Sequence, residues 1–178
     1  MASLVDTHCH VDFDVFEENR PGLLAKCREQ GLTAIIVPGV SRRHWARLEQ
    51  VVESDPLLYG AYGLHPCFLD EHSLEDLESL PDYLKSRQAV AVGEIGLDFF
   101  DSGADRQRQT RYFRDQLMIA QSLELPVLLH VRKAHDQVLK ILREVKLERG
   151  GVVHAFSGSL QQAQIYSGLG FKLGVGGA

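Results

Sequence analysis

Short apolar runs alternate with amphipathic stretches along the chain, and this alternation is the strongest structural signal in the sequence. The apolar runs are rich in residues that favour β-structure. They predict strands over Leu4–Thr7, Thr33–Val37, Leu57–Gly63, Ala89–Glu94, Pro126–His130, Gly151–His154 and Gly170–Val175. Most stretches between them repeat apolar residues at helical spacing. They predict helices over Asn19–Gln30, Ser41–Ser54, Asp105–Leu123, His135–Val145 and Leu160–Ser167.

An alternation of apolar strands with helices predicts a parallel sheet covered by helices. Seven strands in succession favour a TIM-type (β/α) barrel over a short open sheet. No low-complexity linker interrupts the pattern, so residues 1–178 are predicted to form a single domain. A complete barrel of eight units needs about 250 residues, whereas this pattern stops after the seventh strand. The predicted fold is therefore an α/β barrel that is incomplete at its C-terminus and lacks the final β/α unit.

The composition excludes several other classes of protein. Of the 178 residues, 44% are hydrophobic and 24% are charged, which excludes a disordered, collagen-like or coiled-coil chain. The net charge of −5 argues against a protein that holds nucleic acid by bulk positive charge. Ten acidic and two basic residues fall between positions 53 and 98, and such a stretch is most often a solvated helix face.

No feature of the sequence directs the chain to a membrane or out of the cell. We find neither an apolar stretch of about 18 residues nor a secretory signal at the start. Cys9, Cys27 and Cys67 are odd in number and form no C-x-x-C pair, so free thiols in a reducing compartment are expected. The prediction is a cytoplasmic protein, or a nuclear one in a eukaryote, with no obligate protein partner.

Metal-binding residue types gather at the ends of the predicted strands. In Asp6-Thr-His8-Cys-His10, the two histidines stand two positions apart, and such residues point to the same face of a strand. Glu94, His130 and His154 each close a predicted strand. Because the C-terminal strand ends of a barrel meet at one mouth, we expect four imidazoles and one carboxylate to converge there. Nitrogen and oxygen donors of this kind bind zinc, manganese and similar divalent ions.

Glu94 is an unusual residue to follow three alternating apolar positions. A buried ionised carboxylate costs several kcal/mol unless it is paired or bound to a cation. The alternative to a metal is therefore a buried salt bridge to an arginine. The neighbouring Gly93 and Gly96 are expected to let the backbone approach closely whatever Glu94 binds.

Five separated motifs carry these residues. They are Asp6-Thr-His8-Cys-His10, Gly63-Leu-His65-Pro66, Gly93-Glu94-Ile-Gly-Leu-Asp98, His130-Val-Arg132 and His154-Ala-Phe-Ser157-Gly158. In this order they resemble the successive motifs of TatD-type metal-dependent DNases. The resemblance implies a metallo-dependent hydrolase barrel, two divalent ions (Mg²⁺, Mn²⁺ or Zn²⁺) and DNA as the substrate, cleaved at phosphodiester bonds by a 3′–5′ exonuclease.

The resemblance also implies a role for each candidate ligand. The implied sets are His8 and His10 for the first ion, His130 and His154 for the second, and Glu94 as the catalytic residue that bridges both. The family pattern continues to a last strand with an aspartate that completes the first site and can act as general base. No aspartate follows Asp136 here, so the chain resembles a TatD-type protein shortened at its C-terminus.

Three further residues are candidates for substrate contacts. Arg132 could hold a scissile phosphate through two parallel hydrogen bonds, with a surface salt bridge as the alternative. Ser157 could donate to another phosphate oxygen or cap a loop, and His65 could contact substrate or support a ligand. Asp98, Phe99 and Phe100 are predicted to lie on the loop after Glu94, where an exposed aromatic ring could stack on a base or pack under the loop. The remaining histidines are predicted to lie on the surface: His44, His72 and His135.

Two other functions are compatible with these residues. A shortened barrel could be a catalytically impaired remnant that binds metal or nucleic acid. Related barrels with similar ligands also hydrolyse amides or lactones, although the Gly-Glu-Ile-Gly and His-x-Phe-Ser-Gly motifs disfavour that reading. Metal analysis with a nuclease assay distinguishes the remnant from an active nuclease. Assays on nucleotides and on cyclic amides distinguish an amide or lactone hydrolase from a nuclease.

Overall fold

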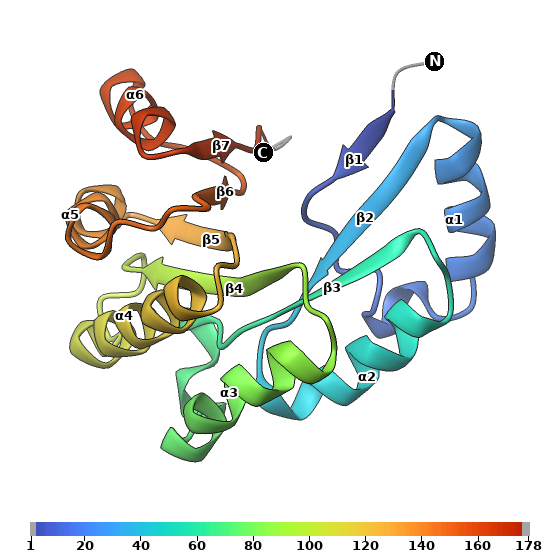
Figure 1. Ribbon diagram of the computed structural model, residues 1–178, viewed down its shortest axis with the longest axis horizontal. Helices are drawn as coiled ribbons and strands as arrows, with labels where there is room; N and C mark the ends of the chain where they lie inside the picture. The colour runs from blue at the N-terminus through green and yellow to red at the C-terminus, as the bar shows by residue number, and fades with distance from the viewer. Residues whose placement is uncertain (1–2, 176–178) are drawn as a thin grey trace.

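The computed structural model describes residues 3–175, which form a curved parallel sheet with helices on its outer face (Figure 1). The strands follow one another in chain order across the sheet. They are β1 Leu4–Asp6, β2 Leu32–Pro38, β3 Leu58–Tyr62, β4 Ala91–Asp98, β5 Val127–Arg132, β6 Gly151–Val153 and β7 Phe171–Leu173. The predicted strands and their parallel pairing are therefore confirmed, and the sheet curls into half of a barrel.

Six α-helices and two short 3₁₀ helices connect the described strands. The α-helices are α1 Arg20–Glu29, α2 Arg42–Glu53, α3 Leu74–Ser86, α4 Arg106–Ser122, α5 His135–Val145 and α6 Leu160–Gly168. The 3₁₀ helices are η1 Asp14–Phe16 and η2 Pro66–Glu71. No helix within residues 3–175 has the length and apolar character needed to cross a bilayer.

Helix α3 was not predicted from the sequence. It begins with a capping box in which Ser73 and Asp76 each accept a hydrogen bond from the other's backbone N–H. Leu80 and Leu84 are buried, while the acidic side chains of this helix lie on its solvent side. Pro81 interrupts the helical signal in the sequence, and the Ser-x-x-Asp spacing was the clue to the start. Four of the ten acidic residues between positions 53 and 98 thus lie on a solvated helix face, and the other six lie elsewhere.

Two buried glutamines of α4 fasten this helix to the ends of two strands. Gln109 accepts from the backbone N–H of Asp98 at 2.8 Å and donates to the carbonyl oxygen of the same residue at 3.0 Å. Gln116 makes the equivalent pair of bonds with Leu64, at 2.7 and 3.1 Å. Buried amides are stable when both ends are paired in this way. The bonds fix the chain beside His65 and at the end of β4.

Candidate metal centre

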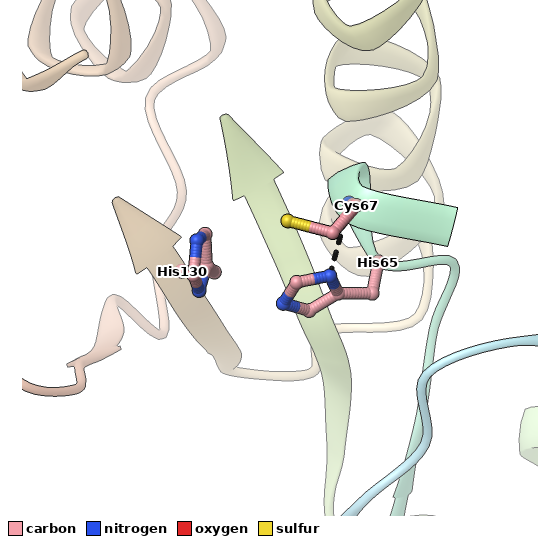
Figure 2. A group of neighbouring side chains, drawn as sticks. All are labelled: His65, Cys67 and His130. Carbon is pink, nitrogen blue, oxygen red and sulfur yellow. Dashed lines mark hydrogen bonds between the residues drawn. The ribbon is translucent and has the colours of Figure 1, made fainter. Parts of the chain in front are cut away.

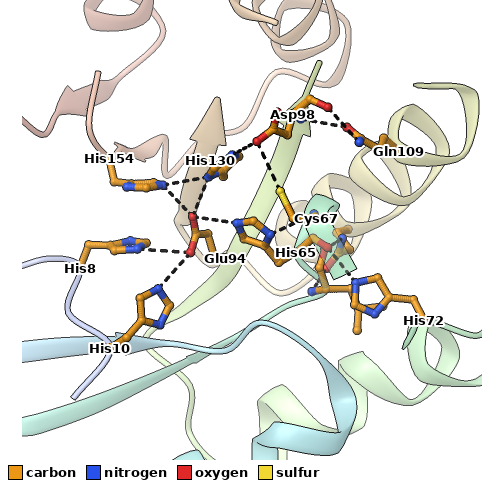
Figure 3. A network of polar contacts seen from close by, with 12 residues as sticks. His8, His10, His65, Cys67, His72, Glu94, Asp98, Gln109, His130 and His154 are labelled. Carbon is orange, nitrogen blue, oxygen red and sulfur yellow. Dashed lines mark hydrogen bonds and ion pairs between the residues drawn. The ribbon is translucent and has the colours of Figure 1, made fainter. Parts of the chain in front are cut away.

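Glu94 on β4 is surrounded by five imidazoles near the C-terminal edge of the sheet (Figure 3). Its side chain is only 2% exposed, and its Oε2 lies 3.2 Å from Nε2 of His8 and 3.4 Å from Nε2 of His10. The other oxygen, Oε1, faces Nε2 of His154 at 2.6 Å, Nδ1 of His130 at 3.1 Å and Nε2 of His65 at 3.2 Å. The predicted four imidazoles do converge on the carboxylate, and His65 joins them.

The segment that carries His8 and His10 is not a strand. β1 ends at Asp6, so strand alternation is the wrong reason for the convergence of the two imidazoles. Instead, the backbone N–H of His8 donates to Oδ1 of Asp6 at 3.0 Å, and that of Cys9 donates to the carbonyl oxygen of Ile36 at 3.1 Å. The second bond ties the segment to β2, and the two ring centroids lie 5.0 Å apart.

The carboxylate of Glu94 is ionised in this setting. Burial by itself raises its pKa, but hydrogen bonds from the surrounding imidazoles outweigh burial and hold the pKa well below its usual value. Every ion-pair partner of Glu94 among residues 3–175 is a histidine, so the alternative of a buried arginine is not found there. Burial lowers the pKa of His8 and of His65, which favours neutral imidazoles. Ionised carboxylate and neutral imidazole are the states that bind metal.

Asp98 orients His130 and was missed as a member of the site. Nε2 of His130 lies 2.9 Å from Oδ2 of Asp98. The carboxylate can only accept, because hydrogen bonds from His130 and from the Phe100 backbone offset burial and lower its pKa. Burial alone would lower the pKa of His130, but the contacts with Glu94 and Asp98 outweigh it and raise that pKa. When the ring is neutral, Asp98 holds its proton on Nε2, so the lone pair on Nδ1 lies on the side of Glu94 and is available to a metal ion. The clue in the sequence was the four-residue spacing, which puts Asp98 on the same face of β4 as Glu94.

His65 turns Nε2 toward Glu94, whereas His130 turns Nδ1 toward it. Nδ1 of His65 accepts from the backbone N–H of Cys67 at 3.1 Å, so the neutral ring carries its proton on Nε2. That nitrogen donates to Oε1 of Glu94 at 3.2 Å. His65 thus supports the carboxylate as a donor and has no free lone pair directed at the cluster.

Two sets of donor atoms fit a divalent ion each. One set is His8, His10 and Glu94, and the other is Glu94, His130 and His154. Within each set the donor atoms lie no more than 4.8 Å apart, and Glu94 belongs to both. Neutral imidazole nitrogens and an ionised carboxylate are donors suited to zinc, manganese and similar ions. The residues present therefore fit the metal that the sequence motifs imply.

A third group, His65, Cys67 and His130, is less suited to metal (Figure 2). The thiol of Cys67 donates to Oδ2 of Asp98 at 3.3 Å. Burial raises the pKa of this thiol to about 12, so it stays protonated at neutral pH. A protonated thiol is a weak ligand, and His65 already uses both ring nitrogens.

The other two candidate substrate residues, Arg132 and Ser157, are not among the side chains that contact Glu94. Arg132, the last residue of β5, holds its guanidinium 3.6 Å from the ring centroid of Phe100. No ion pair involves Arg132 within residues 3–175, so the predicted alternative of a surface salt bridge is not found there. Ser157 is exposed in the segment between β6 and α6, and in the described part of the chain no hydrogen bond links it to the cluster.

Two histidines predicted to lie on the surface are buried. His72 donates from Nε2 to the carbonyl oxygen of His65 at 2.9 Å, and His135 contacts the hydroxyl of Tyr166 through Nδ1 at 3.2 Å. Burial lowers the pKa of both rings. Their polar sequence neighbours suggested exposure, but each ring turns inward to a tertiary partner. His44, by contrast, is partly exposed and contacts the hydroxyl of Ser41.

The glycines beside Glu94 serve the sheet rather than a ligand. A Cβ built at Gly93 would overlap the side chain of Leu128, and one at Gly96 would overlap the backbone of His130. Both neighbours lie on β5. The expectation that these glycines open space for a ligand is therefore wrong, because β5 occupies that space.

Comparisons with known proteins agree with this geometry. Residues 5–178 match the family described as TatD related DNase. The chain is 45% identical over 175 residues to a relative from Escherichia coli K12 named an uncharacterized metal-dependent hydrolase, YjjV, covering 97% of this chain and 68% of the relative. The crystal structure of this TatD homolog superposes with a TM-score of 0.93 at 44% identity, over 98% of this chain and 68% of that one.

A relative from a Pantoea species is named a 3′-5′ ssDNA/RNA exonuclease, TatD. It is 32% identical over 165 residues, which cover 91% of this chain and 63% of the relative. The curved parallel sheet and the histidine–carboxylate cluster define a metal-dependent hydrolase, an enzyme class that acts on ester bonds. Within that class, this chain belongs to the TatD family.

Proposed function

We propose that this chain is a deoxyribonuclease that uses two divalent metal ions to hydrolyse phosphodiester bonds from the 3′ end of a DNA strand. The observation that carries the proposal is the convergence of five imidazoles on one buried, ionised carboxylate. The similarity to the Pantoea 3′-5′ ssDNA/RNA exonuclease supports the 3′-to-5′ direction and a nucleic-acid substrate. We further propose that residues 1–178 act as one domain, which the single sheet and its one main core support.

The chain's own residues divide the work at this centre. In our proposal His8 and His10 would hold the first ion, His130 and His154 would hold the second, and Glu94 would serve both sites. Bound divalent ions supply Lewis acidity, which polarises a phosphoryl oxygen and lowers the pKa of a coordinated water. Two bound divalent ions would add four positive charges at this mouth, which would let a chain of net charge −5 bind a polyanion.

Arg132 is the residue best placed to bind the phosphate. Its guanidinium stacks on Phe100 through one face. The N–H groups at the edge of the guanidinium can then donate two parallel hydrogen bonds to a phosphate. His65 keeps Glu94 in position by donation from Nε2. Ser157 is the weaker candidate, because it lies exposed and without a bond to the cluster.

The function is tested by assaying the purified chain after chelation and reloading with Mg²⁺, Mn²⁺ or Zn²⁺. Single-stranded DNA labelled at its 5′ end is expected to give a ladder of products shortened from the 3′ end. Parallel assays under the same conditions use double-stranded DNA, RNA and a lactone as substrates. Bound metal without cleavage of any nucleic acid would contradict the nuclease proposal and favour a binding remnant, and turnover of the lactone alone would assign the chain to a different reaction.

Replacing Asp98 with asparagine is expected to weaken metal binding about 10- to 100-fold, the usual cost of losing a partner that orients a metal-binding histidine. The amide can donate to Nε2 of His130, which would move the ring proton to Nδ1 and remove the lone pair that faces Glu94. Competition with a chromogenic chelator measures the affinity directly. Asp115→Asn, on the outer face of α4, is the control, and equal affinities in the two variants would refute the positioning role of Asp98.

A further inference from the structure

A cavity of about 390 Å³ opens beside the metal centre and is not used by the ligands themselves. One side is formed by η2, including Pro66 and Cys67, and the other by the segment that joins β4 to α4. Asp98 lines the cavity and also contacts His130 (Figure 3). The cavity is therefore adjacent to the candidate metal site, with Asp98 between them, and its volume is in the range that encloses a small organic ligand.

The wall of this cavity carries a stacked pair. Phe100 is 60% exposed, which is unusual for a phenylalanine, and the guanidinium carbon of Arg132 lies over the ring, 3.6 Å from its centroid. Both side chains line the cavity. Aromatic rings and arginine planes bind nucleobases by stacking, and each stacked base contributes about 1–3 kcal/mol. This pair is thus a platform for a flat, uncharged ring.

The cavity is lined by more negative than positive side chains, and negative charge repels a phosphate. Four aspartates and two arginines line it, so its net charge is negative. Asp70 and Asp101 are exposed and lie on the two sides of the opening. Arg108 is engaged, since its guanidinium donates to the carbonyl oxygen of His72 at 2.7 Å. Carboxylates accept hydrogen bonds from hydroxyl groups and repel phosphates.

We infer that this cavity binds the 3′-terminal nucleoside of the strand, with its base on the Phe100–Arg132 pair and its free 3′-hydroxyl toward Asp70 and Asp101. The inference rests on the proposed nuclease function and adds a selectivity to it. A strand that ends in a 3′-hydroxyl is accepted, whereas a strand that ends in a 3′-phosphate is rejected by the acidic rim. The phosphate on the 5′ side of the terminal nucleoside then faces Arg132 and the metal centre.

Binding of short single strands tests this subsite. The probes are hexadeoxynucleotides with the fluorescent base 2-aminopurine at the 3′ or at the 5′ terminus and phosphorothioate linkages that slow cleavage. The Mn²⁺-loaded protein is expected to quench the 3′-terminal probe by stacking and to leave the 5′-terminal probe unchanged. Phe100→Ala is expected to weaken binding of the 3′ probe about 5- to 100-fold, the loss of one stacked base. Met118→Ala, which removes an exposed side chain on α4, is the matched control.

The acidic rim is tested with the same strands ending in 3′-phosphate. Wild-type protein is expected to bind them more weakly than 3′-hydroxyl strands, and the double variant Asp70→Asn with Asp101→Asn is expected to reduce that difference. Equal binding of the 3′ probe by wild type and Phe100→Ala, or equal wild-type binding of both strand ends, would overturn the subsite while cleavage continued. A wild-type protein that neither bound nor cleaved any strand would overturn the nuclease proposal together with it.

Discussion

Glu94→Ala is expected to lose most of its bound metal and to lower phosphodiester hydrolysis by roughly 10³-fold or more. Glu94 is the only residue shared by both candidate ion sites in the described chain, so its removal affects the two sites together. It also removes the negative charge that opposes the repulsion between two cations held close to each other. Metal content by mass spectrometry and the rate of 3′ shortening of single-stranded DNA are the two measurements.

A folding defect must be separated from the loss of a ligand. Glu94→Gln keeps the volume and the hydrogen bond from His65 but not the charge, so it should fold like wild type and still lose metal. Glu78→Ala, an exposed acidic residue of α3, is the surface control. A Glu94→Ala protein that kept both its metal and its activity would remove the bridging role.

The candidate site was predictable because each ligand interrupts a local pattern. An ionisable side chain at the end of an apolar strand is costly unless it has a partner, and parallel strands bring such ends to one edge. Glu94 and His130 were found for this reason. Each of the seven predicted strands ends before or after the last residue of the observed strand, but the ligands still meet, since the edge of the sheet and not the last residue of each strand decides their place.

The residues that were missed depend on partners distant in sequence. The sequence predicts Asp98 on a loop, but it pairs with Arg132 across the β4–β5 ladder and its side chain contacts His130. His72 and His135 sit among polar neighbours in the sequence, and tertiary contacts alone make them buried. Local periodicity carries no information about such contacts. Helix α3 was missed for a local reason, because Pro81 obscures the helical pattern.

Gly96→Ala is expected to destabilise the protein by about 3 kcal/mol or more and to weaken metal binding at the same time. Gly96 pairs with His130 across the β4–β5 ladder, and its φ of +147° is a conformation that residues with a side chain rarely adopt. A methyl group there would overlap the carbonyl oxygen of His130, which belongs to the backbone and cannot rotate away. Relief of the overlap requires β5 to shift, and His130 would move with it away from Glu94.

Two measurements and a matched glycine distinguish this effect from a general cost of substitution. Denaturant unfolding reports the loss of stability, and chelator competition reports the displacement of His130. Gly22→Ala is the control, because nothing lies within 4 Å of the added methyl group in α1 and alanine favours the helix. It should leave stability unchanged or raise it by up to about 1 kcal/mol. A Gly96→Ala variant as stable as Gly22→Ala would show that the close approach of β4 to β5 does not hold His130 in place.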